Sequence, residues 1–158
     1  KIDICVFTIT DNNISNAIIE AHRRGLMLRV ITDNDKSEDR GSDIDRFRRE
    51  GINVLVDETD KHMHHKFAIF DGPRADLAFA TEGTLASGSG NWSNSAATRY
   101  DENTLIVAGN AELNLRFQRE FNHLWDNGRL FVWNESLDSV THVAITAADS
   151  SLVILDRP

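Results

Sequence analysis

Two short stretches of the chain hold residues whose types and spacing suit a reaction at phosphorus. Residues 62–71 read HMHHKFAIFD, and residues 88–93 read GSGNWS. If residues 64–70 form a β-strand, His64 and Lys66 point to one side and His65 points to the other. An imidazole can act as nucleophile or proton carrier, and a lysine supplies a fixed positive charge for phosphate oxygens. For an isolated pair, the alternative is a surface histidine beside a lysine that packs its stem on the protein.

The order of the motif residues makes the chemical interpretation more specific. His64-x-Lys66-x4-Asp71, followed by Gly88-Ser89-x-Asn91, resembles the signature of the phospholipase D superfamily. The residues in and around the motif are most similar to the small single-motif branch of this superfamily. That branch contains bacterial endonucleases and mitochondrial cardiolipin hydrolases, or Zucchini-type nucleases. Further similarity at residues 7–11, 24–25, 102–103 and 121–125 extends the resemblance over residues 1–127.

The resemblance implies a reaction through a covalent phosphohistidine on His64. In the family, a second histidine from another copy of the motif protonates the leaving oxygen and later activates water. This sequence holds one copy, and one imidazole cannot readily serve on both sides of phosphorus. We therefore expect a homodimer whose two-fold axis passes through the active site, with two coupled imidazoles and a bell-shaped pH profile.

The other motif residues have expected roles and simpler alternatives. Asn91 is expected to donate to a phosphate oxygen beside Lys66, with Ser89 supporting the charge network, although serine and asparagine are also ordinary turn residues. Glu102 matches the acidic residue that holds the catalytic histidine by its far nitrogen. Its alternative is a salt bridge at a strand edge.

Asp71 and Trp92 complete the set of candidate site residues. Asp71 belongs to the motif, but strand alternation turns it away from His64, so we expect a structural role for it. Trp92 either stacks on a base of the substrate or anchors the turn that contains Asn91.

No metal or cofactor is expected. A zinc site at His62, His64 and His65 is disfavoured because His65 should face away from the other two. The Asp33-x-Asp35 pair is interpreted as a solvated turn after a strand rather than a cation site. Cys5 is the one cysteine, which excludes a disulfide within the chain and a cysteine-based zinc cluster.

The hydrophobic pattern predicts the elements that must position these residues. Strands are expected at residues 2–9, 26–32, 52–56, 64–70, 77–86 and 104–107, with helices after residue 12, at 43–50 and at 111–125. The first strand–helix–strand unit predicts parallel pairing with a right-handed crossover. The fold class is α/β, with a mixed central β-sheet flanked by helices, as the phospholipase D resemblance also implies.

The length of 158 residues fits one domain. We expect a catalytic domain over residues 1–127, truncated at its N-terminal end, and a β-rich segment over 128–158 that is either a tail or the start of a further domain. Because the net charge is −8, any phosphate must enter a locally positive cleft. No run of residues is long and apolar enough for membrane insertion, which favours a soluble, cytoplasmic protein.

The expected activity is hydrolysis of nucleic acid, with single strands favoured. Two rival interpretations stay open. One is a phospholipase acting on cardiolipin-like lipid, which would keep every catalytic residue and change only the cleft walls. The other is a non-catalytic dimeric scaffold of the same fold.

Overall fold

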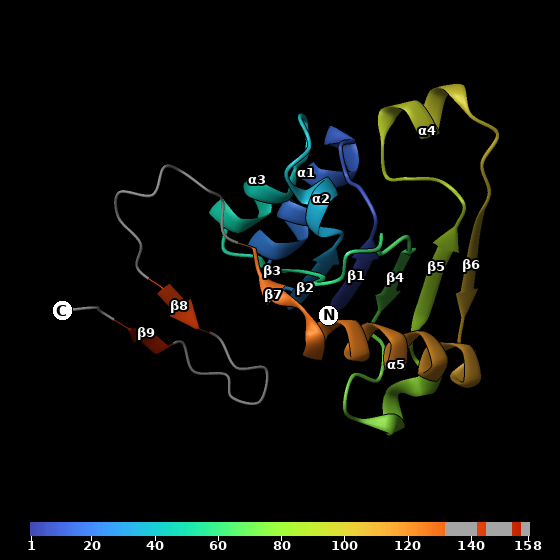
Figure 1. Cartoon of the computed structure of the whole chain (residues 1–158). Coiled ribbons are helices and arrows are strands. Elements are labelled where there is room, and N and C mark those ends of the chain that lie inside the picture. The colour runs from blue at the N-terminus through green and yellow to red at the C-terminus, as the bar shows by residue number, and fades with distance from the viewer. Residues whose placement is uncertain (132–141, 145–152, 156–158) are drawn as a thin grey trace.

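The computed structural model describes residues 1–131, 142–144 and 153–155 (Figure 1). Its elements follow in this order: β1 (Ile2–Val6), α1 (Asn12–Arg23), β2 (Leu28–Thr32), α2 (Asn34–Ser37), α3 (Ile44–Arg49), β3 (Asn53–Val56), β4 (Lys66–Phe70), the 3₁₀ helix η1 (Leu77–Thr81), β5 (Thr84–Gly88), α4 (Asn94–Arg99), β6 (Thr104–Ala108), α5 (Ala111–Asn127), β7 (Arg129–Leu130), β8 (His142–Ala144) and β9 (Val153–Leu155).

Seven strands form one mixed sheet in the order β6-β5-β4-β1-β2-β3-β7. The pairs β1–β2 and β2–β3 are parallel, and β4, β5 and β6 join as antiparallel neighbours on the β1 side. The predicted fold class and the parallel strand–helix–strand unit are both confirmed. Since β1, β2 and β3 end at the same edge where β4 begins, that edge collects Lys66 and the residues that follow β1.

A separate hydrophobic core covers each face of the sheet. On one face, alternate residues of the central strands pack with α1 and α3, including Val6, Ala68, Ile18 and Phe47. On the other face, Phe67 and its neighbours pack against α5. Figure 1 shows α5 lying across the strands of the sheet. Side chains alternate along β4, so Lys66 and Ala68 share the α1 face while Phe67 faces α5.

Two predicted elements differ from the structure. The polar stretch 33–43 contains the helical turn α2, because the buried Asp33 carboxylate accepts the backbone N–H of Lys36 at 3.0 Å and begins it. Residues 77–86 are a strand only from Thr84 onward. Their first half is η1, which begins where the Asp76 side chain caps Ala78.

The C-terminal segment is described only in part. β7 pairs antiparallel with β3 and extends the main sheet to residue 130. β8 and β9 pair with each other in a second, two-stranded sheet within the segment 128–158 that was expected to be β-rich. The other residues of that segment beyond residue 131 lie outside the described part. In the described part of the chain, no helix has the length and apolar character needed to cross a bilayer.

Candidate active site

Lys66 is placed at the edge of the sheet, beside His64. It is the first residue of β4, pairs with Val6 of β1, and is only 9% exposed. Its ammonium donates to the backbone carbonyl of His64 at 2.9 Å and lies 3.0 Å from Nδ1 and 3.4 Å from Nε2 of the His64 ring. His64 precedes the strand instead of lying within it, yet the expected common orientation of the two side chains is present.

The ring of Phe7 forms the apolar side of this pair. Its centroid lies 4.5 Å from the centroid of the His64 ring and 5.5 Å from the ammonium of Lys66. Because Phe7 directly follows β1, the parallel strands of the sheet fix the position of the Phe7 ring, against which His64 and Lys66 lie. An ammonium above an aromatic face is also attracted by the ring quadrupole.

The pKa values of both reactive groups are shifted downward. Desolvation is the main cause for His64, followed by the positive charges of Lys66 and His62. Desolvation also lowers the pKa of Lys66, and the carboxylate of Glu102 partly opposes that shift. The His64 imidazole is therefore neutral, and able to act as a nucleophile, at a lower pH than an ordinary histidine.

Asp33 positions the segment that leads into Lys66, a role the sequence interpretation missed. Its side chain is fully buried, and Oδ2 accepts the backbone N–H of Met63 at 2.9 Å and lies 3.2 Å from Nδ1 of His62. The interpretation of Asp33 as part of a solvated turn was wrong. An aspartate directly after the buried strand β2 was the available signal, since parallel strands end on the catalytic edge.

The second stretch is held in place by a hydrogen-bond network around Ser89. Its hydroxyl donates to the carboxylate of Glu102 and accepts from the backbone N–H and the side-chain amide of Asn103, both at 3.1 Å. Gly88 permits this arrangement, because a Cβ there would lie 2.0 Å from the carbonyl oxygen of Asn103. The turn and the start of β6 thus form one unit.

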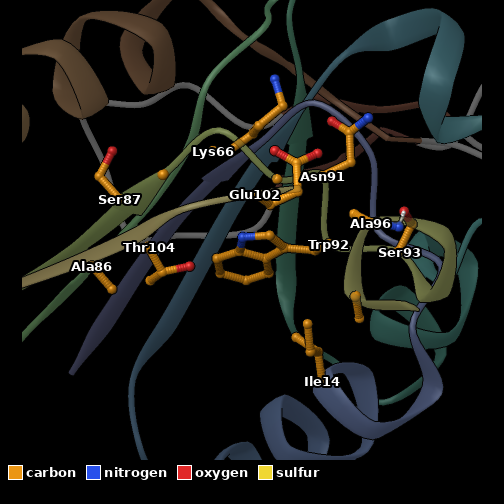
Figure 2. A pocket seen from close by; sticks show the side chains of 13 residues that line it. Ile14, Lys66, Ala86, Ser87, Asn91, Trp92, Ser93, Ala96, Glu102 and Thr104 are labelled. Atoms are coloured by element: carbon orange, nitrogen blue, oxygen red, sulfur yellow. Dashed lines mark hydrogen bonds between the residues drawn. The ribbon is translucent and has the colours of Figure 1, made fainter. Parts of the chain in front are cut away.

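Asn91 and Trp92 are attached to the turn between β1 and α1. A single parallel bridge joins Ile9 to Trp92, whose carbonyl accepts the backbone N–H groups of Thr10 at 2.9 Å and Asp11 at 3.1 Å. The side-chain oxygen of Asn91 is buried and has no hydrogen-bond partner. Figure 2 shows that Asn91, Lys66 and Glu102 line the same pocket, where a phosphate oxygen could accept from the Asn91 side-chain N–H₂ group and from the Lys66 ammonium.

One expected contact is absent from the single chain. Among the hydrogen bonds of the described residues, Glu102 is joined to Ser89 and none connects it to His64. The reason is that Glu102 enters β6, two strands from β4, and Ser89 lies next to it. Asp71 lies at the opposite end of β4, where it is exposed and has a φ of 50°. Its backbone N–H donates to the backbone carbonyl oxygen of Lys1. Asp71 is therefore not brought to the site.

The histidines next to His64 fall on two sides of the strand. His65 faces α5 and lies 3.1 Å from the carboxylate of Glu120. His62 lies with Asp33 and Asp35 in a set, here called the Asp33 group, whose possible ligand atoms all lie within 4.8 Å of one another. Both oxygens of Asp33 already accept backbone N–H groups, which explains the geometry of the Asp33 group without a cation.

A second hollow of about 580 Å³ lies on the α5 side of the same edge. Lys66 of β4 and the preceding His64 line it on one side, and Arg116 and Glu120 line it from α5. The pocket of Figure 2 and this hollow share Lys66, Ser87 and Gly88, so Lys66 lies between two open spaces. A chain-like substrate could extend into both spaces from a phosphate held at Lys66.

Comparison with known proteins gives a consistent result. A family model described as "Cardiolipin synthase, PLD-like domain" matches residues 1–125. The chain is 45% identical over 125 residues to the mitochondrial cardiolipin hydrolase of Chlamydomonas reinhardtii, covering 79% of this chain and 51% of that protein. It is 34% identical over 126 residues to the human protein of the same name, covering 80% of this chain and 46% of that protein. The chain thus spans about half the length of these curated relatives.

Solved structures show the same fold at lower sequence identity. The phospholipase D family member Nuc from Salmonella typhimurium superimposes with a TM-score of 0.72 at 22% identity, covering 84% of this chain and 82% of that one. NucT from Helicobacter pylori gives a TM-score of 0.67 at 20% identity, covering 82% and 81%.

Proposed function

Because the chain belongs to the PLD-like (phospholipase D-like) family, we propose that it is a metal-independent phosphodiesterase that cleaves nucleic acid, with single strands favoured. The observation that carries the proposal is the His64 imidazole 3.0 Å from the Lys66 ammonium, beside a pocket that Lys66 lines together with the side chain of Asn91. Nucleophile, fixed charge and hydrogen-bonding group are then available to one phosphodiester.

In the first proposed step, a nitrogen of His64 attacks phosphorus. The new N–P bond forms as the P–O bond to the leaving group breaks, and the leaving oxygen takes a proton from an imidazolium on the opposite side. A phosphate oxygen replaces the contacts that Lys66 makes with the His64 ring, and Asn91 contacts a second oxygen. In the second step, water attacks phosphorus, gives its proton to the opposite imidazole and breaks the N–P bond.

The opposite imidazole is assigned to His64 of the partner subunit in a homodimer. Two features support this. His64 is exposed, so a second molecule can reach it. His62, the other histidine next to Phe7, is tied to the buried Asp33 on the same side as His64, whereas in-line displacement needs its acid on the far side.

Glu102 and Ser89 are assigned a supporting role in this proposal. The carboxylate counteracts the lowering of the Lys66 pKa and holds the turn with Asn91 through Ser89. Asp71 is given no part in the chemistry. The activity is assigned to residues 1–127, with no function assigned to residues 128–158.

A lipid phosphodiesterase is the second candidate, because the relatives that match at 34–45% identity are named as cardiolipin hydrolases. The catalytic residues would be the same for both substrates. A panel of single-stranded and double-stranded DNA, RNA and cardiolipin vesicles separates the two candidates.

The proposal is tested with His64→Ala, which should keep the fold and lose turnover of whichever substrate is cleaved. Acid quenching of the wild-type reaction should trap a phosphorylated histidine. Mixed dimers of His64→Ala and wild-type chains should be inactive, because each contains one functional imidazole. Full activity of the variant, or of a strict wild-type monomer, would refute the mechanism.

A further inference from the structure

A slot extends from the phosphate-binding residues toward α1 and α4. It has a volume of about 330 Å³, and Lys66, Asn91 and Glu102 form its head (Figure 2). The indole of Trp92 lies between this head and Ile14 of α1, as Figure 2 shows. We call this space the Trp92 slot. A group bonded to a phosphate at Lys66 would enter it directly.

The walls of the Trp92 slot are apolar and built from small side chains. Ile14 is half-buried, and Ala96 and Ala97 line the slot from α4. Ala97 is exposed to solvent although it lines the slot, so the space is open at that wall. The half-buried Trp92 side chain packs against the α1-face core, and three backbone hydrogen bonds fix the main chain of Trp92.

Unused polar groups stand beside these apolar walls. In the part of the chain that the structure describes, the Trp92 indole N–H and the Thr104 hydroxyl make no hydrogen bond, and the Asn91 side-chain oxygen is buried without a partner. An acyl chain would bury these groups without satisfying them, which costs free energy. A nucleobase has two apolar faces and an edge of donors and acceptors, so it fits both features.

We propose that the Trp92 slot binds one unpaired nucleobase of the substrate, next to the phosphate held by Lys66 and Asn91. The proposal rests on the proposed nuclease function and specifies it, since a base in the slot must be unstacked from its neighbours and unpaired. Trp92 supplies the stacking face or edge contact, and Ala97 leaves the room for the base. Thr104 contacts the polar edge.

The first experiment narrows the slot from its open wall. Ala97→Phe fills it from an exposed helix position, and Thr98→Phe, at the next exposed position, is outside the slot and serves as the matched control. Each is assayed on a single-stranded oligonucleotide and on an oligomer of equal length made of abasic units. Wild type should prefer the base-bearing oligomer by about tenfold in kcat/KM, within the range of one base–aromatic contact. Ala97→Phe should remove that preference, whereas Thr98→Phe should keep it and leave cleavage of both oligomers unchanged.

The second experiment measures binding without turnover. A nucleoside 5′-monophosphate should shift the indole N–H resonance of Trp92, identified with Trp92→Phe, whereas ribose 5-phosphate should not. This shift would support the slot even if no oligonucleotide is cleaved, an outcome that would refute only the nuclease function.

Three results would overturn the slot proposal. The first is an unchanged preference for bases in Ala97→Phe together with no selective shift of Trp92. The second is an equal loss on both oligomers. The third is a loss on cardiolipin vesicles alone, which would assign the slot to an acyl chain.

Discussion

Replacing Gly88 by alanine should separate the two halves of the active site. A Cβ at this position would lie 2.0 Å from the carbonyl oxygen of Asn103, 3.0 Å from its carbon and 3.1 Å from the Cα of Thr104. All three atoms belong to the backbone, so no side-chain rotation relieves the clash. The end of β5 and the start of β6 must move apart.

The size of that movement follows from the contact itself. Restoring an ordinary separation of 3.4 Å from 2.0 Å requires a displacement of about 1.4 Å. Overpacking of this kind costs about 1–3 kcal/mol of unfolding free energy. Because Ser89 is bonded to both Asn103 and Glu102, the displacement passes to the turn that carries Asn91, and a shift of about 1 Å in a positioning group can cost about 100-fold in rate.

Hydrolysis of bis(4-nitrophenyl) phosphate and urea unfolding measure the two effects separately. The expected result for Gly88→Ala is a loss of about 100-fold in kcat/KM with a folded protein, less stable by about 1–3 kcal/mol. Gly90→Ala is the matched control, because its Cβ would meet only the side chain of Glu102, at 3.4 Å or more. Wild-type kcat/KM in Gly88→Ala, or an equal loss in both variants, would show that this close approach does not position the site.

Three further predictions concern pH, stability and metal. The pKa of His64 is lowered first by desolvation and then by the charge of Lys66, so the acidic limb of the kcat/KM profile should lie below pH 6.5. In Lys66→Met, an NMR titration should show the titration midpoint of His64 at higher pH than in wild type. An unmoved midpoint would contradict a contribution of Lys66 to the shift. Burial alone would raise the pKa of Asp3, but its two arginine partners and Gln118 together lower that pKa. The ionised Asp3 therefore stabilises the fold at pH values above its unfolded pKa near 3.8, and this stabilisation is lost as the pH falls through the folded pKa. Asp3→Asn should therefore lower the free energy of unfolding in urea at pH 7 by about 3 kcal/mol. A change within experimental error would show that the interactions of Asp3 with its two arginine partners do not stabilise the fold. Excess EDTA should leave turnover unchanged, because the proposed reaction uses imidazole and lysine alone; complete loss would instead make the Asp33 group a metal site.

The sequence predicted the sheet and the reactive pair because both depend on local patterns. Alternation along residues 64–70 placed His64 with Lys66 and separated His65, as found. The spacing of apolar residues in 111–125 predicted α5, whose Phe121 is buried in the core on that face of the sheet. Predicting these features requires only the side-chain period of a strand or a helix and the order of the strands, so the sequence was sufficient.

Contacts between distant segments were beyond these patterns. The buried position of Asp33 depends on Met63, 30 residues later, which no periodicity relates to it. The partner of Glu102 depended on which residue lay beside the start of β6, and Ser89 occupies that position. The conversion of 77–81 into a 3₁₀ helix followed from the Asp76 cap, which competes with strand pairing in a segment of ambiguous pattern.

The bridge between Ile9 and Trp92 makes the loop of Asn91 part of the turn after β1, although more than 80 residues separate them along the chain. Amide hydrogen exchange at Thr10 and Asp11 should then slow together when substrate is bound, since both donate to the Trp92 carbonyl. Lengthening the β1–α1 turn by one residue would shift the amide of Asn91 relative to Lys66 without altering either catalytic stretch. In the proposed mechanism, the tolerance of that turn to insertion is thus limited by the position that Asn91 must keep beside Lys66.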